Sequence, residues 1–132
     1  DKIAVFSNFG NWVDVASPGV NIVSVRAKHK GKYLDMYRDA GHKKASYAIG
    51  NDSKQAYDDR AYFIASGTSM ACPNAAGVVA MMLAVNPNLK TKTEQVRQIL
   101  MQTSEKKGTF KIKADGGRIN ALKALQAAQN AK

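Results

Sequence analysis

The feature that most constrains this 132-residue chain is an apolar run from Met70 to Val85, in which Asn74 is the only strongly polar residue. A helix that is apolar on every side is expected to be buried on every side. The run ends at Asn86-Pro87, where proline cannot continue a helix. The sequence therefore predicts a buried central helix in a layered α/β domain.

Short runs of β-branched and aromatic residues, separated by turn signals, precede this helix and predict strands. A polar, charged stretch separates the last two of them, and it has the composition of a surface insertion at 26–60. After the helix, Thr91-Lys92-Thr93-Glu94 has the spacing of a capping box before another amphipathic helix. The predicted strands are Ile3 to Phe6, Trp12 to Ala16, Val20 to Val25 and Ala61 to Ala65.

Composition limits the classes of function. The chain is long enough for one domain with a core, and its formal net charge is +10. Its basic residues carry no stacking motif, zinc-finger spacing or recognition helix, so a nucleic-acid partner is not expected. Ala75 to Val85 is too short to span a bilayer, so no membrane partner is expected. The single cysteine, Cys72, excludes an internal disulfide, and we expect it to be a small buried core residue.

One serine, Ser69, stands at the start of the apolar helix. Free backbone N–H groups and the helix dipole favour negative charge there, so an anion formed beside Ser69 would be stabilised. The alternative is an ordinary helix cap, which is the commoner role of such serines. An α/β-hydrolase takes its histidine after the serine, and here both histidines, His29 and His42, precede it. That class is excluded.

Several segments resemble the subtilisin-like serine proteases, the subtilases. SGTSMACP (Ser66 to Pro73) resembles their serine-nucleophile motif. Further matches, in the family's order, cover nearly the whole chain except the stretch between Val25 and Ala61. They are FSNFG, VDVASPGVNIVS, AAGVVAMML followed by NPNL, and GGRINALKAL.

The resemblance implies the C-terminal portion of a three-layer subtilisin-like fold, with a mostly parallel sheet and a buried central helix that starts at the catalytic serine. By the same resemblance, Ser69 is the nucleophile and its own N–H is one donor to the oxyanion. Thr68 supports that oxyanion hole, and Ser66 and Gly67 run alongside the substrate backbone.

The family's catalytic Asp and His motifs do not occur in this sequence. His29 and His42 lack the expected context. Asp14 matches a scaffold residue of the family and not its catalytic Asp, and Asn8 lies after the position of the oxyanion Asn. Asn74 stands where many members have His after the Pro.

We therefore expect a segment of a serine endopeptidase that hydrolyses protein or peptide substrates through an acyl-enzyme. It requires an N-terminal segment of the same catalytic domain, so this chain alone should be inactive. The alternative is a non-catalytic subtilase-like scaffold or binding module. No cofactor is needed for the chemistry. The family commonly binds structural calcium, but the ligands in this chain are not identified: Asp52, Asp58 and Asp59 offer oxygen donors, and their spacing fits no EF-hand loop. The resemblance implies a secreted or extracytoplasmic protein.

Overall fold

A computed structural model describes most of the chain as two compact units. One unit comprises Asp1–Gly19 and Gly67–Lys132, and the other comprises Val20–Ser66. The described residues are 2–25, 28–29, 32–33, 62–106 and 116–132.

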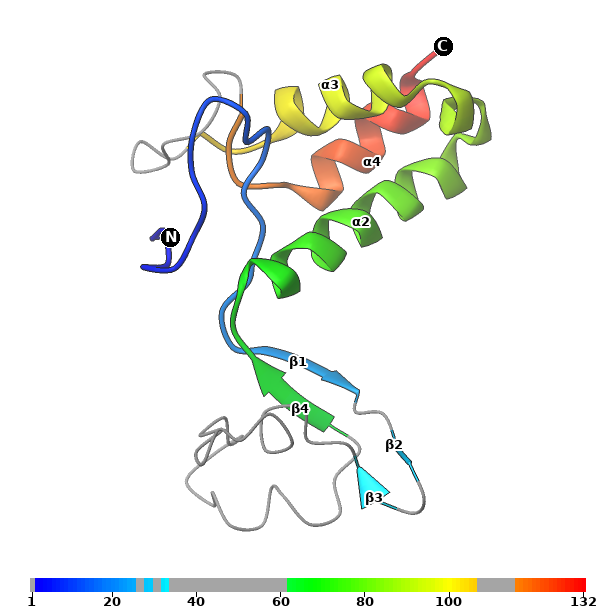
Figure 1. The fold of residues 1–132 in the computed structure, drawn as a ribbon. Coiled ribbons are helices and arrows are strands. Elements are labelled where there is room, and N and C mark those ends of the chain that lie inside the picture. Colours follow the sequence, from blue (N-terminus) through cyan, green and yellow to red (C-terminus); the bar gives the residue numbers. More distant parts are fainter. Residues whose placement is uncertain (1, 26–27, 30–31, 34–61, 107–115) are drawn as a thin grey trace. The chain divides into compact units, whose positions relative to one another are not determined.

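The described part of the first unit contains three α-helices and one short 3-10 helix. The elements are α2 (Thr68–Val85), η1 (Pro87–Thr91), α3 (Thr93–Thr103) and α4 (Ala121–Asn130). Helix α4 packs against both α2 and α3 (Figure 1). The predicted capping box does not form: Lys92 is the N-cap of α3 and makes no side-chain cap. Thr91 already belongs to η1 and is therefore not available as the cap.

The core of this unit lies where the three helices meet. Met82 and Leu89 are fully buried at its centre. The buried residues of helix α4 are small: Ala124 and Ala128 share one face of the helix at a spacing of four and allow close packing. The other buried members of the cluster are Val78, Val96 and Ile99.

A buried asparagine joins α2 to the end of α4. Asn86 is 7% exposed, and its side-chain amide donates to the carbonyls of Ala128 (2.9 Å) and Ala131 (2.8 Å). Its side-chain oxygen accepts from the backbone N–H of Asn88 at 3.2 Å. Carbonyls at a helix C-terminus have no partner within the helix. The Ala128 carbonyl also accepts from the N–H of Ala131 at 3.2 Å, so Asn86 adds a second donor there and supplies the side-chain donor to the part-buried Ala131 carbonyl.

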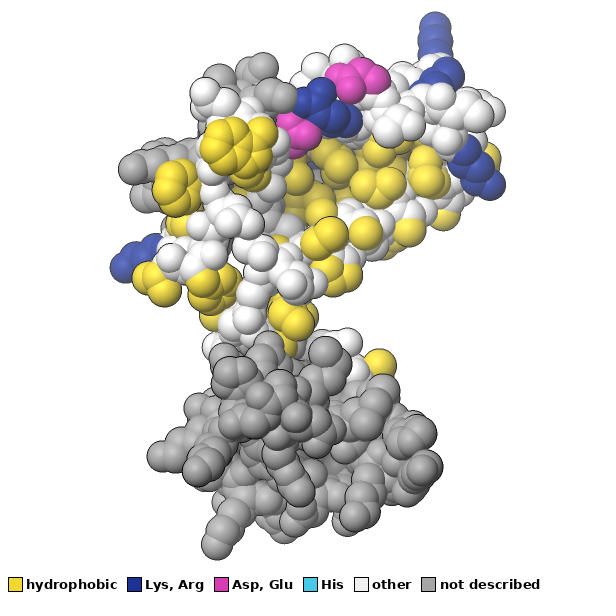
Figure 2. Space-filling view, viewed as in Figure 1, with side chains coloured by type: hydrophobic (Ala, Val, Ile, Leu, Met, Phe, Trp, Pro, Cys, Tyr) yellow, Lys and Arg dark blue, Asp and Glu magenta, His cyan; other side chains and the backbone are white. Residues whose placement is uncertain are grey.

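Most of α2 is not covered by the described part of the chain. Only Val78 and Met82 are buried along this helix, whereas Met81 and Val85 are each more than two-fifths exposed. Hydrophobic side chains are visible along its surface in Figure 2. The predicted burial on every side is therefore not found, because among the described elements only η1 and α4 pack closely on α2.

The apolar length of α2 also exceeds the sequence-based expectation. The whole helix has 18 residues and meets the length and composition of a membrane span, in contrast to the shorter run from Ala75 to Val85. The core helix of a soluble protein meets the same criteria.

The N-terminal segment of this unit contains no strand between residues 2 and 19, so the strands predicted at 3–6 and 12–16 are wrong. A strand needs a hydrogen-bonded neighbouring strand along its length, and the only β-bridge described within residues 2–19 is the single bridge of Ala16 with Arg118. Ala16 accepts from Ile119 N–H and donates to the Gly117 carbonyl, both at 2.8 Å. Arg118 in turn forms an antiparallel bridge with Glu105. This junction attaches the N-terminal segment to the segment that leads into α4.

The described residues of the second unit form two short antiparallel strand pairs. Strand β1 (Ile22–Val25) pairs with β4 (Tyr62–Ala65), with Ile22 opposite Ala65. Strand β2 (Lys28–His29) pairs with β3 (Lys32–Tyr33) as a small hairpin inside the predicted insertion. The rest of the insertion lies outside the described residues. Both described pairs are antiparallel, and the mostly parallel sheet stays a prediction.

Candidate active site

Ser69 is the second residue of α2, and its side chain is exposed. The N-cap of the helix is Gly67, with no side-chain cap. Ser69 is therefore not the helix cap that the alternative interpretation assumed. Its hydroxyl makes no hydrogen bond to any residue that the structure describes. A hydroxyl that does not serve the helix is available for another role.

The first turn of α2 leaves backbone donors open beside this hydroxyl. The N–H groups of Met70 and Ala71 both point to the Gly67 carbonyl, at 3.0 and 3.3 Å. The N–H groups of Thr68 and Ser69 have no acceptor within the described residues. Unpaired amides at the positive end of a helix dipole stabilise a negatively charged oxygen. The turn thus provides a hydroxyl and an anion-stabilising environment together.

The glycine that this turn requires is Gly19, and not Gly67. Gly67 has extended backbone, and a Cβ there would come no closer than 3.6 Å to another atom. A Cβ at Gly19 would lie 2.8 Å from the Gly67 carbonyl oxygen and 3.0 Å from Ala71 Cβ. A side chain at position 67 would therefore fit this turn without a steric clash. The close approach of residue 19 to the helix start demands the small residue.

Ser66 belongs to the second unit and is tied to the start of β1. Its hydroxyl accepts from the backbone N–H of Asn21 at 2.8 Å and lies 3.5 Å from the Asn21 side-chain oxygen. Asn21 has a left-handed backbone, with φ of 54°. This contact fixes the residue just before the Gly67-Thr68-Ser69 sequence.

Thr68 is exposed and borders a hollow of about 250 Å³ in the first unit. Cys72 also lines this hollow and is exposed, so its predicted place in the core is wrong. Like much of α2, it lies on a side of the helix that the described elements leave open. The rest of the lining comes from Ala71, Ala75 and the N-terminal segment, including Ile3, Asn8, Val13 and Val15.

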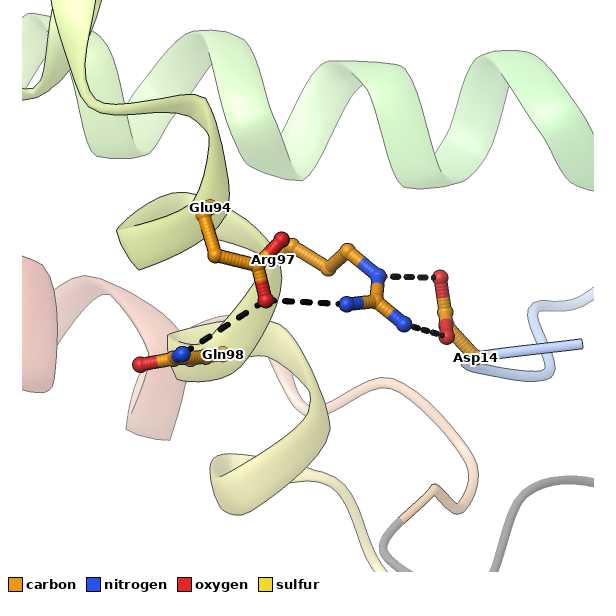
Figure 3. Close-up of polar contacts among 4 residues, drawn as sticks. All are labelled: Asp14, Glu94, Arg97 and Gln98. Atoms are coloured by element: carbon orange, nitrogen blue, oxygen red, sulfur yellow. Dashed lines mark hydrogen bonds and ion pairs between the residues drawn. The ribbon is translucent and has the colours of Figure 1, made fainter.

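The described side chains include no candidate base for Ser69. The side chain of His29 and the whole of His42 lie outside the described residues. Asp14 is held by Arg97, whose Nε and Nη2 reach its two carboxylate oxygens at 2.8 and 2.7 Å (Figure 3). The hydrogen bond to Asp14 raises the pKa of Arg97 further above its ordinary value. An Asp held in this way acts as part of the scaffold, as the resemblance implied.

The described residues include no cluster of three or more His, Cys, Asp or Glu side chains that would suit a metal ion. Asp52, Asp58 and Asp59 lie outside them. Sequence reasoning did not assign partners to Arg97, Asn74 or Gly19. A single arginine on an amphipathic helix does not indicate which acidic residue it binds, so its partner Asp14, 83 positions away, could not be predicted from the sequence.

The described site is an exposed serine on the first turn of an apolar helix, with open backbone amides beside it. This arrangement suits a serine nucleophile, and comparison with known proteins identifies a family of serine proteases. The model of the subtilase family matches residues 1–120. The chain therefore belongs to the subtilase family, whose members are serine proteases with an α/β fold.

Named relatives agree with this assignment. The chain is 30% identical over 125 residues to a thermophilic serine proteinase of Bacillus sp. strain AK1, covering 95% of this chain and 22% of that protein. It is 32% identical over 133 residues to the serine protease AprX of Bacillus subtilis, covering 96% and 25%. A calcium-dependent protease of Trichormus variabilis is 41% identical over 71 residues, covering 47% and 10%. The chain thus spans a quarter or less of the length of these relatives.

Proposed function

We propose that this chain supplies the nucleophile of a subtilisin-like serine endopeptidase, with Ser69 as that nucleophile. The observation that carries the proposal is the exposed Ser69 hydroxyl on the first turn of α2, which does not cap the helix and has no hydrogen-bond partner among the described residues. A serine attacks a peptide carbonyl when an adjacent base removes its proton, and the product is an acyl-enzyme that water then hydrolyses.

The N–H of Ser69 is our candidate for one oxyanion donor, with Thr68 supporting it from the preceding position. The absence of an acceptor for this N–H among the described residues supports the assignment. Donors preorganised toward the developing negative charge supply one of the largest contributions to such catalysis. Ser66 and Gly67 are proposed to run alongside the backbone of a protein or peptide substrate.

The catalytic Asp, His and oxyanion Asn are proposed to come from an N-terminal segment of the same catalytic domain. Two observations support this division: the matched part is a quarter or less of its relatives, and α2 is apolar yet mostly exposed. A segment packed on α2 would bury that surface and complete the mostly parallel sheet of the three-layer fold. Structural calcium and an extracytoplasmic location belong to the same proposal, by family resemblance.

The test is kinetic and uses the complete protein that contains both segments. Ser69→Ala should abolish turnover of a peptide substrate, and the neighbouring exposed Thr68→Ser variant should retain most of it. Retention of turnover by Ser69→Ala would contradict the proposal. A complete protein that binds peptides without cleaving them, with equal affinity before and after Ser69→Ala, would instead establish the scaffold alternative.

A further inference from the structure

A proline inside α2 weakens the turn that carries Ser69. Pro73 is the sixth residue of the helix and has no backbone N–H. In a regular helix the N–H of residue 73 would donate to the carbonyl of Ser69, four positions earlier. The proline ring also crowds that carbonyl. The helix therefore holds its own first turn less firmly than an uninterrupted helix would.

Contacts from outside the helix compensate for this loss. The N–H of Gly67 donates to the Gly19 carbonyl at 2.8 Å, and the side-chain amide of Asn74 donates to the Pro18 carbonyl at 3.1 Å. Between these two bonds, Gly19 approaches Ala71 so closely that a Cβ would not fit. Pro18 and Gly19 are thus bonded to Gly67 before Ser69 and to Asn74, more than one helical turn after it.

The Pro18–Gly19 pair is itself anchored to the rest of the first unit. Two residues earlier, Ala16 makes its two backbone hydrogen bonds to Gly117 and Ile119. Two residues before that, Asp14 is held by Arg97 of α3. A short, anchored segment therefore connects α3 and the start of α4 to the Ser69 turn. A displacement of this segment would be passed directly to the serine.

We propose that Asn74 is a positioning residue for Ser69, acting through its hydrogen bond to the Pro18 carbonyl. This inference rests on the proposed function of Ser69 as nucleophile. In this role Asn74 acts through Pro18 and takes no part in the chemical step itself. It keeps the helix start aligned on the anchored segment, where a displacement of about 1 Å is enough to lower the rate of a chemical step roughly 100-fold.

A positioning role for Asn74 and a role in general stability predict different effects on kcat and on the melting temperature. The Asn74 bond is exposed, and an exposed hydrogen bond contributes little to the free energy of unfolding. Loss of the bond should therefore lower kcat by about 10- to 100-fold with KM changed less than about threefold. The melting temperature should stay close to that of the wild-type protein.

The experiment compares Asn74→Asp, which keeps the shape and removes the donor, with Asn130→Asp in the complete enzyme. Asn130 is a matched control because its side-chain amide also donates to a backbone carbonyl, that of Gln126 at 3.0 Å, on the exposed side of α4. We measure kcat and KM on a peptide substrate and the rate at which a fluorophosphonate labels Ser69. Asn74→Asp should lower kcat and the labelling rate, Asn130→Asp should change neither, and Asn74→Gln, which keeps the donor, should recover part of the loss.

Unchanged kcat in a folded Asn74→Asp variant would overturn the inference, and so would equal losses in the Asn130→Asp control. If Asn74→Asp does not fold, the uncharged Asn74→Ala variant is measured in the same way. Unfolding of both would also overturn the inference, because it would make Asn74 a residue of the general fold. Ser69→Ala is measured in parallel. If Ser69→Ala keeps its turnover, the proposed function itself is contradicted. If Ser69→Ala loses turnover while Asn74→Asp keeps the wild-type kcat, only the role of Asn74 is contradicted.

Discussion

Arg97 and Asp14 are 83 positions apart in the sequence and are joined by two parallel hydrogen bonds, of 2.8 and 2.7 Å. Arg97 also reaches Glu94, one turn earlier on α3, at 2.9 Å (Figure 3). The planar guanidinium matches the two carboxylate oxygens in a way that a lysine ammonium does not. The pair therefore fixes the N-terminal segment on α3 in one orientation.

We predict that Arg97→Lys and Asp14→Asn each lower the melting temperature of the complete protein. The double variant should lose little more than either single variant, because the two side chains act on one interaction. Thermal unfolding of the four proteins measures this coupling. Glu94→Gln is the control: it removes the more exposed partner of Arg97 and should have the smaller effect. Fully additive losses would show that the pair does not act as a unit.

Asn86→Ala should be among the more destabilising polar substitutions in the first unit. It removes the side-chain donor to the Ala128 and Ala131 carbonyls, of which only Ala128 keeps a described backbone donor, at a cost of about 2 kcal/mol in the free energy of unfolding. Chemical denaturation measures the change. Asn130→Ala removes an exposed bond of the same type and should cost less than about 0.5 kcal/mol. Equal costs would contradict the buried role of Asn86.

Gly19→Ala should reduce activity through the same turn that carries Ser69. Its methyl group would meet the Gly67 carbonyl oxygen at 2.8 Å, so the segment or the helix start must move. We expect kcat on a peptide substrate to fall by about 10-fold or more. Gly67→Ala should be tolerated sterically, since its nearest contact would be 3.6 Å. A Gly19→Ala variant with wild-type kcat would show that the close approach is not maintained in the complete enzyme.

The chain expressed without an N-terminal segment should hydrolyse no peptide bond at an enzymatic rate and should self-associate. A serine without a base is a poor nucleophile, and the exposed apolar surface of α2 favours association. Analytical ultracentrifugation and a peptide-cleavage assay test both points. Met81→Gln on α2 should reduce association more than Leu122→Gln on α4. A monodisperse monomer that melts cooperatively, or cleavage that depends on Ser69, would contradict this prediction.

The sequence predicted the long apolar helix well because its signal is local. Its expected start at Met70 differs from the observed Thr68 by two residues, and its end at Val85 is confirmed. That small difference moved Ser69 from the helix cap into the helix. The strands expected at 3–6 and 12–16 are wrong because their apolar residues say nothing about which neighbours are present to pair with them.

In the candidate site, too, local features could be predicted from the sequence and long-range contacts could not. A motif pointed to Ser69 and its neighbours, and the family match agrees with that motif. The partners of Asp14, Asn74 and Gly19 could not be predicted, because each depends on a contact between segments more than 40 positions apart. Cys72 was misplaced for a related reason: the hydrophobicity of a residue does not tell whether anything covers it.

The central claim is that Ser69 is the nucleophile, and the most direct measurement is the site of covalent labelling by a fluorophosphonate in the complete protein. Mass spectrometry of the labelled protein should place one adduct on the peptide that contains Ser69, with loss of turnover proportional to labelling. Ser69→Ala should take up no label and should unfold within about 0.5 kcal/mol of the wild-type protein, since the hydroxyl is exposed and does not cap the helix. An adduct on another residue, or full activity in a protein labelled at Ser69, would contradict the account.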